Sequence, residues 1–178
     1  MSTTGSVFLK ESRSLLIGDY LPKLERCVNL LTDEQIWWRA NPASNSIGNL
    51  LLHLSGNVRQ WIVVGLGGAV DSRDRNAEFA QRDVIPRDAL LTRLRDTLRE
   101  ADQTLANFEH ERLLEQFAIQ GLEVSALAAI MHVVEHFSMH TGQIILLAKM
   151  FTERDLEFYD FNSGAPVHTW RTKAEVTE

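Results

Sequence analysis

Hydrophobic residues recur at spacings of three and four along most of this chain, which is the period of amphipathic α-helices. The pattern predicts four long helices, at about residues 7–31, 46–66, 86–108 and 124–151. Pro22 lacks a backbone N–H, so we expect a kink in the first helix there. No segment alternates apolar and polar residues over the length of a strand. The sequence therefore predicts an all-α protein.

Polar segments separate the predicted helices. A short helical turn is expected after residues 32–34, a loop at residues 41–45, and an irregular connection at residues 71–83 with a short turn near Ala77. A chain of 178 residues suits one domain with a sizeable core. We therefore expect a single domain over residues 1–178, with a partly irregular tail at about 162–178.

The fourth predicted helix is apolar on nearly every side. A helix of this kind is buried on every side. In a domain this small, a second subunit could supply part of that burial, so the pattern points to a homodimer.

Polar residues form one narrow seam along this apolar helix: His132, His136, His140 and Gln143. Successive helical residues turn by about 100°, so positions four apart lie on one side. Burying several imidazoles costs free energy unless each finds a partner, and a metal ion satisfies several at once. His136 and His140, one turn apart, can bind the same ion. No glutamate follows His136, which disfavours a metalloprotease of the H-E-x-x-H type.

The second predicted helix supplies a candidate third ligand, His53. Asn49, Asn57 and Gln60 share its side of the helix, so a second polar seam lies next to the apolar face. Two facing seams would close a site of three histidines, His53, His136 and His140, which leaves coordination positions open as in catalytic zinc sites. Taken alone, each histidine is also compatible with a hydrogen-bonded structural role. His132 is ambiguous, because it could form an alternative pair with His136.

Two stretches carry a family resemblance. The segments NSIGNLLLHL (residues 45–54) and HVVEHFSMHTGQI (residues 132–144) resemble the DinB-like family, most closely the branch known only as a domain of unknown function. The resemblance extends from the first helix to Phe161, with the same order of elements.

The resemblance implies an up-down-down-up four-helix bundle with short extra helical turns, commonly a homodimer. It also implies one divalent metal per chain, zinc or nickel, held by His53, His136 and His140. Related bacterial members activate a low-molecular-weight thiol, such as bacillithiol or mycothiol, for S-transfer, and others are maleylpyruvate isomerases or hydrolases.

The resulting expectation is a metal-dependent transferase acting on a small thiol and an electrophile. A non-catalytic metal-binding stress protein and a metal-dependent hydrolase stay open as alternatives. The candidates to orient ligands or substrate near the ion are Asn49, Asn57, Gln60, His132 and Gln143.

Charge and composition narrow the partners. The net charge is −6, from 18 basic and 24 acidic residues, which argues against a nucleic-acid partner. No apolar run approaches the roughly 20 residues that span a bilayer, and the N-terminus lacks the pattern of a signal peptide. We therefore expect a cytoplasmic protein with no membrane partner. The one cysteine, Cys27, cannot form an internal disulfide.

Overall fold

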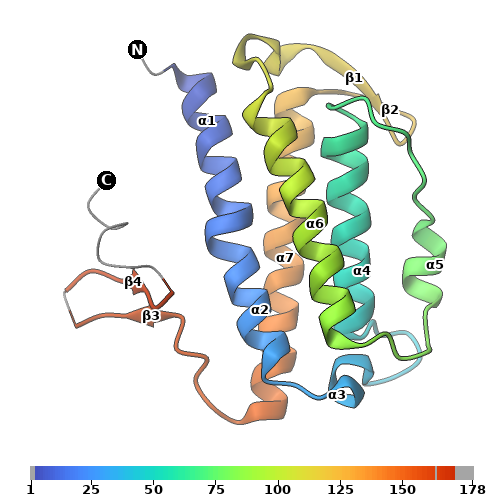
Figure 1. Cartoon of the computed structure of the whole chain (residues 1–178), viewed down its shortest axis with the longest axis vertical. Helices are drawn as coiled ribbons and strands as arrows, with labels where there is room; N and C mark the ends of the chain where they lie inside the picture. Colours follow the sequence, from blue (N-terminus) through green and yellow to red (C-terminus); the bar gives the residue numbers. More distant parts are fainter. Residues whose placement is uncertain (1–2, 163, 171–178) are drawn as a thin grey trace.

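Four long helices form a bundle in the computed structural model, which describes residues 3–162 and 164–170. In chain order they are α1 (Thr4–Arg13) continued through a π-helical segment (Ser14–Tyr20) into α2 (Leu21–Asn29), α4 (Ile47–Val58) with a π-helical end (Arg59–Val64), α6 (Arg87–Ala106) and α7 (Ala126–Thr152). The α1–α2 helix and α4 each pack against both α6 and α7. The first and last helices run one way and α4 and α6 the other, which confirms the expected up-down-down-up bundle (Figure 1).

The bundle core is apolar and draws on all four helices. Leu24, Leu54, Leu94 and Phe137, one from each helix, are among its buried side chains. They come from the periodic apolar positions that predicted the helices. Among the described residues, no helix is both long and apolar enough to cross a membrane.

The first helix is irregular around Pro22. The amide of Leu21 donates to the carbonyl of Leu16, five residues back, so the helix is wider there than an α-helix. Pro22 has no N–H for the carbonyl of Gly18, four residues earlier. The indole nitrogen of Trp170 donates to that carbonyl at 3.0 Å. The predicted kink thus takes the form of a π-helical segment, and the freed carbonyl helps to hold the end of the chain.

Two short antiparallel hairpins depart from the prediction that no strands form. The first joins β1 (Gln116–Ile119) to β2 (Leu122–Ser125), with Phe117 opposite Val124. Both turn residues, Gln120 and Gly121, have positive φ angles of 54° and 77°, as a tight hairpin turn requires. Strands of four residues are too short for alternation to reveal them. The fourth helix accordingly begins at Ala126, and not at Val124.

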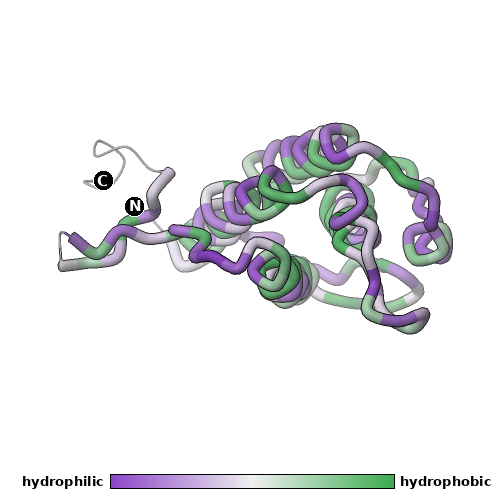
Figure 2. Tube along the Cα trace, turned by 90° about the horizontal axis from the view of Figure 1, so that it is seen from below, coloured by the Kyte–Doolittle hydropathy of each residue, from purple (hydrophilic) through white to green (hydrophobic). Residues whose placement is uncertain are grey.

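The second hairpin pairs β3 (Tyr159–Asp160) with β4 (Val167–His168). It lies to one side of the bundle, as the view along the helices shows (Figure 2). The Arg26 side chain on α2 donates to the backbone carbonyls of Leu156 and Glu157, just before this hairpin. Strand β4 lies in the tail expected to be partly irregular; residues 163 and 171–178 of that tail fall outside the described residues.

A long crossover over residues 65–86 connects α4 to α6. These two helices run in the same direction, so the chain must travel back along the bundle between them (Figure 1). The crossover carries α5 (Arg75–Ala80), whose first turn is capped by Asp74 and which packs against α4. The sequence predicted only a short turn near Ala77, within a polar irregular segment. The other short helical elements are α3 (Asp33–Trp37) and a 3₁₀ turn (His110–Leu114).

Candidate metal centre

Three histidine side chains from α4 and α7 meet between the two helices. His53 Nε2 lies 3.0 Å from His136 Nε2, and His140 Nε2 lies 3.1 Å from the same atom. All three ligand atoms lie within 4.8 Å of one another, so this cluster could hold a metal ion. The structure therefore brings together the three residues predicted as ligands, one from α4 and two from successive turns of α7.

A carboxylate determines which ring nitrogen of His53 carries the proton. His53 Nδ1 lies 2.9 Å from Glu78 Oε2, and a carboxylate can only accept a hydrogen bond. Arg73 Nη2 is also 3.2 Å from His53 Nδ1. However, a lone pair on Nδ1 would face the Glu78 carboxylate oxygen with no hydrogen between the two acceptors. Nδ1 therefore donates to Glu78, and His53 Nε2 presents its lone pair to the cluster.

The same reasoning applies to His140. Its Nδ1 lies 2.7 Å from the amide oxygen of Gln143, so Nδ1 donates and Nε2 is left with a lone pair. His136 Nε2 then faces two lone pairs and can give a hydrogen to only one of them. A cation among the three nitrogens satisfies all of them at once, and this is the strongest physical argument for a metal.

The spacing of the nitrogens fits such an ion. Zinc–nitrogen bonds of about 2.0–2.1 Å in a tetrahedral site place neighbouring ligands about 3.3 Å apart. The separations of 3.0 and 3.1 Å from His136 Nε2 are close to that value, and the third pair, His53 and His140, lies within 4.8 Å. Three protein ligands also leave at least one coordination position for another molecule.

Burial lowers the pKa of two of the three histidines, His136 and His140. Only 5% of His53 and 9% of His140 is exposed. Burial, followed by the neighbouring histidines, lowers the pKa of His136 to about 3. Burial also lowers the pKa of His140, although the hydrogen bond with Gln143 acts in the opposite direction. Neutral imidazole is the form that binds metals, so His136 and His140 have no proton to lose near neutral pH.

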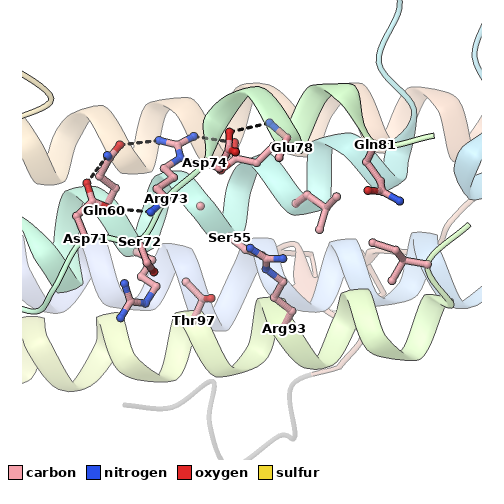
Figure 3. Close-up of a pocket in the computed structure, with 15 residues that line it drawn as sticks. Ser55, Gln60, Asp71, Ser72, Arg73, Asp74, Glu78, Gln81, Arg93 and Thr97 are labelled. Carbon is pink, nitrogen blue, oxygen red and sulfur yellow. Dashed lines mark hydrogen bonds and ion pairs between the residues drawn. The ribbon is translucent and has the colours of Figure 1, made fainter. Parts of the chain in front are cut away.

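An ion pair between Glu78 and Arg73, drawn in Figure 3, was not among the predicted site residues and supports the cluster through His53. The Arg73 guanidinium donates to both oxygens of Glu78, at 2.8 and 2.9 Å, and both side chains are only 5% exposed. Burial raises the pKa of Glu78, but the hydrogen bonds from Arg73 and His53 outweigh it, so the net pKa lies below its ordinary value. Glu78 is thus a buried carboxylate that orients a candidate metal ligand.

Gly56 explains how Glu78 comes so close to α4. A Cβ at this position would lie 1.9 Å from Glu78 Oε1 and 2.9 Å from Arg73 Nε. Only glycine leaves room for the carboxylate against the helix, one turn after His53. A glycine inside an apolar helix is a sign of close approach, and it was the one signal in the sequence that could have pointed to this contact.

Two of the other predicted site residues have structural roles. Asn49 lies in the capping box at the start of α4, and its amide donates to the carbonyls of Glu78 and Gln81. Gln60 accepts from Arg73 and donates to Asp71. Both residues anchor the crossover, so they act on His53 only through Glu78 and Arg73.

His132, Asn57 and Trp61 form a group next to the cluster. His132 Nε2 lies 3.4 Å from the Asn57 amide nitrogen, and its ring centroid is 5.5 Å from that of His136. The Trp61 ring packs against the His132 ring, with the two ring centroids 4.1 Å apart. His132 therefore lies beside the group of three histidines whose ligand atoms converge, and is not part of it.

The comparisons with known proteins agree with this fold. Residues 3–164 match the model of a family described as Protein of unknown function (DUF1572). No curated protein matches the chain significantly.

Two solved structures resemble the chain at low sequence identity. A DinB-like protein from Bacillus cereus is 16% identical, with a TM-score of 0.60 over 74% of this chain and 85% of that one. A conserved protein from Enterococcus faecalis is 14% identical, with a TM-score of 0.67 over 82% of this chain and 97% of that one. The helical fold of the DinB-like proteins is thereby confirmed, and by its match over residues 3–164 the chain belongs to the DUF1572 family of unknown function.

Proposed function

We propose that the protein binds one divalent metal ion per chain, zinc or nickel, and uses it to transfer a small thiol to an electrophile. The ligands are the Nε2 atoms of His53, His136 and His140. The observation that carries the proposal is the convergence of these three nitrogens, two of them with lone pairs directed inward by Glu78 and Gln143.

The donor set favours zinc or nickel over harder ions. Three imidazole nitrogens suit zinc and nickel, whereas calcium and magnesium prefer oxygen ligands. The nearest buried carboxylate, Glu78, is directed at His53 Nδ1 and Arg73 and not at the centre of the cluster. The chain therefore offers an all-nitrogen site with room for a further ligand.

A thiol for this reaction has to come from solution. The chain has a single cysteine, Cys27, which is fully buried. Burial raises the pKa of its thiol to about 12, so it stays protonated and unreactive. A bound divalent ion would supply Lewis acidity that lowers the pKa of an external thiol such as bacillithiol or mycothiol. In the transfer a sulfur–carbon bond forms, the leaving group departs with its electron pair, and the thiol proton passes to solvent.

Two other functions use the same three ligands. A hydrolase would differ only in activating water in place of a thiol. A metal-binding protein without turnover is favoured by the burial of His53 and His140, which restricts access to the ion.

The test uses the full-length chain loaded with zinc or nickel. Metal content is measured by elemental analysis, and thiol conjugation is followed with bacillithiol or mycothiol and 1-chloro-2,4-dinitrobenzene. We expect one ion per chain, and a conjugation rate that the His53→Ala, His136→Ala double variant loses. The matched control is His110→Ala, in the 3₁₀ turn outside the cluster.

The outcomes separate the three functions. Equal conjugation rates in the native protein and the double variant refute the transferase, while one bound ion without turnover favours the metal-binding protein. Release of a hydrolysis product from an ester substrate without thiol favours the hydrolase. Absence of stoichiometric metal in the native protein refutes all three.

We also propose that a second copy of the chain covers the outer face of α7. Leu127, Met131, Met139, Leu146 and Met150 are exposed there, between 37% and 61%. A helix with apolar residues on its outer side gains free energy when a partner covers them. Light scattering should give twice the chain mass, and Met131→Lys with Leu146→Lys should give the mass of one chain. A single-chain mass for the native protein would refute the homodimer.

A further inference from the structure

A separate pocket of about 270 Å³ is lined in part by Glu78 and Arg73. Its walls are α4, the crossover and α6, and the histidine ligands are not among its lining residues. Figure 3 shows Arg93 and Thr97 extending from α6 toward α4, with Asp71, Ser72 and Asp74 on the crossover.

Most charged groups around this pocket are already engaged. Arg73 and Glu78 pair with each other. Asp71 accepts from the Gln60 amide and from the backbone of Arg73. Asp74 Oδ1 caps the first turn of α5 by accepting from Ala77. These side chains line the pocket, and each already has a hydrogen-bond partner within the chain.

Arg93 differs from these groups. Arg93 is exposed, and in the described part of the chain its guanidinium has no hydrogen bond, ion pair or aromatic contact. Thr97 lies one turn further along α6, on the same face, and is only 7% exposed. The hydroxyls of Thr97 and of the exposed Ser72 also have no hydrogen-bond partner among residues 3–162 and 164–170. The pocket thus offers a cation with its full set of donors, together with two free hydroxyls.

Apolar side chains line another part of the pocket: Leu52 on α4, Ala77 on α5 and Ile85 near the start of α6. The lining also includes Ser55, Gly56, Arg59, Gln60 and Gln81. A ligand that matches both parts has one anionic group and a short aliphatic chain. A guanidinium donates two parallel hydrogen bonds to a planar carboxylate, a geometry that favours carboxylates over spherical anions.

We propose that this pocket binds a small aliphatic carboxylate, with the carboxylate held by Arg93 and the Thr97 hydroxyl and the chain packed against Leu52 and Ile85. The proposal does not depend on the metal or on thiol transfer. The bound carboxylate would pair with Arg93, which has no partner among the described residues.

The test is a titration of the zinc-loaded, full-length protein with sodium butyrate, followed by amide chemical shifts and by calorimetry. Sodium chloride at equal ionic strength and n-butylamine are titrated in parallel. The variants are Arg93→Gln and Thr97→Val, and the control is Arg99→Gln, because Arg99 lies on α6 outside the pocket and pairs with Asp96. Thermal melting of each variant verifies folding.

We expect saturable butyrate binding, with shifts centred on residues that line the pocket. Arg93→Gln should weaken it at least ten-fold, Thr97→Val by a smaller factor, and Arg99→Gln by less than two-fold. Non-saturable shifts, equal binding by n-butylamine, or butyrate binding that survives Arg93→Gln overturn the proposal. The last result also covers butyrate bound directly to zinc, because Arg93 is not a ligand.

Discussion

Replacing Glu78 by glutamine tests the support of the metal centre most directly. The substitution keeps the size of the side chain but removes its charge and turns one acceptor oxygen into an NH₂ group. Glu78 accepts from Arg73 Nε at 2.8 Å, Arg73 Nη2 at 2.9 Å and His53 Nδ1 at 2.9 Å. At least one of these three donors loses its acceptor, and the Arg73 charge loses its counter-ion.

The size of the effect follows from these contacts. A hydrogen bond to a charged group contributes about 1.5–3 kcal/mol, against about 0.5–1.5 kcal/mol for a neutral one. Three such bonds weakened by about 1 kcal/mol each give about 3 kcal/mol. Breaking a buried ion pair on one side costs about 3–5 kcal/mol, which is consistent with that figure. We also expect zinc affinity to fall about 10–100-fold, because Glu78 no longer fixes the ring of His53.

Urea denaturation of the metal-free protein measures the first effect, and competition with a chromophoric chelator measures the second. The control is Glu115→Gln, which removes an exposed carboxylate paired with Arg112 at 2.7 Å and should cost less than about 1 kcal/mol. If Glu78→Gln costs no more than this control and leaves zinc affinity unchanged, the orienting role of Glu78 is wrong.

Three further outcomes follow from the same centre. In the metal-free protein, His136 stays neutral down to about pH 3, whereas the unfolded chain takes up this proton near pH 6.5. The unfolded state therefore binds more protons than the folded state. Urea titrations should show the free energy of unfolding falling from pH 7 to pH 4, by at most about 1.4 kcal/mol per pH unit for this group. A free energy of unfolding that does not change with pH would contradict this expectation. Removing zinc with a chelator should lower the melting temperature, because zinc at 100 times its Kd stabilises the fold by about 2.7 kcal/mol; identical melting curves would count against a site. Gly56→Ala should destabilise the protein by about 1–3 kcal/mol and weaken zinc binding by displacing Glu78. The helical control is Gly142→Ala, which should have neither effect because an added Cβ there meets nothing within 4 Å. Equal denaturation midpoints for the two variants would refute the close approach at Gly56.

Helix periodicity was enough to predict the four long helices and the shared face of His136 and His140. The spacing of His136 and His140 places them on one side of a helix whatever the rest of the chain does. His53 required one more assumption, that the polar seam of its helix faces that of α7. The family resemblance supplied this pairing, and the structure brings the three rings together.

The support around the cluster could not be predicted in the same way. Glu78 reaches His53 only because the crossover returns along α4, and no local pattern specifies the path of a polar connection. Asn49 shares the seam with His53, but its position three residues after Ser46 makes it part of a capping box. A helical seam indicates a direction in space; it does not tell which of its members are used at the helix end.

The location of Glu78 has a consequence for how quickly an ion could leave. The histidines lie on long bundle helices, whereas their carboxylate anchor lies on a crossover tied to α4 by the Asn49 amide. Segments of this kind open locally at a lower free energy than the bundle unfolds. Detachment of α5 would free the His53 ring while the four helices stay folded. We therefore expect the off-rate of the metal to follow hydrogen exchange of the α5 amides and not that of the core.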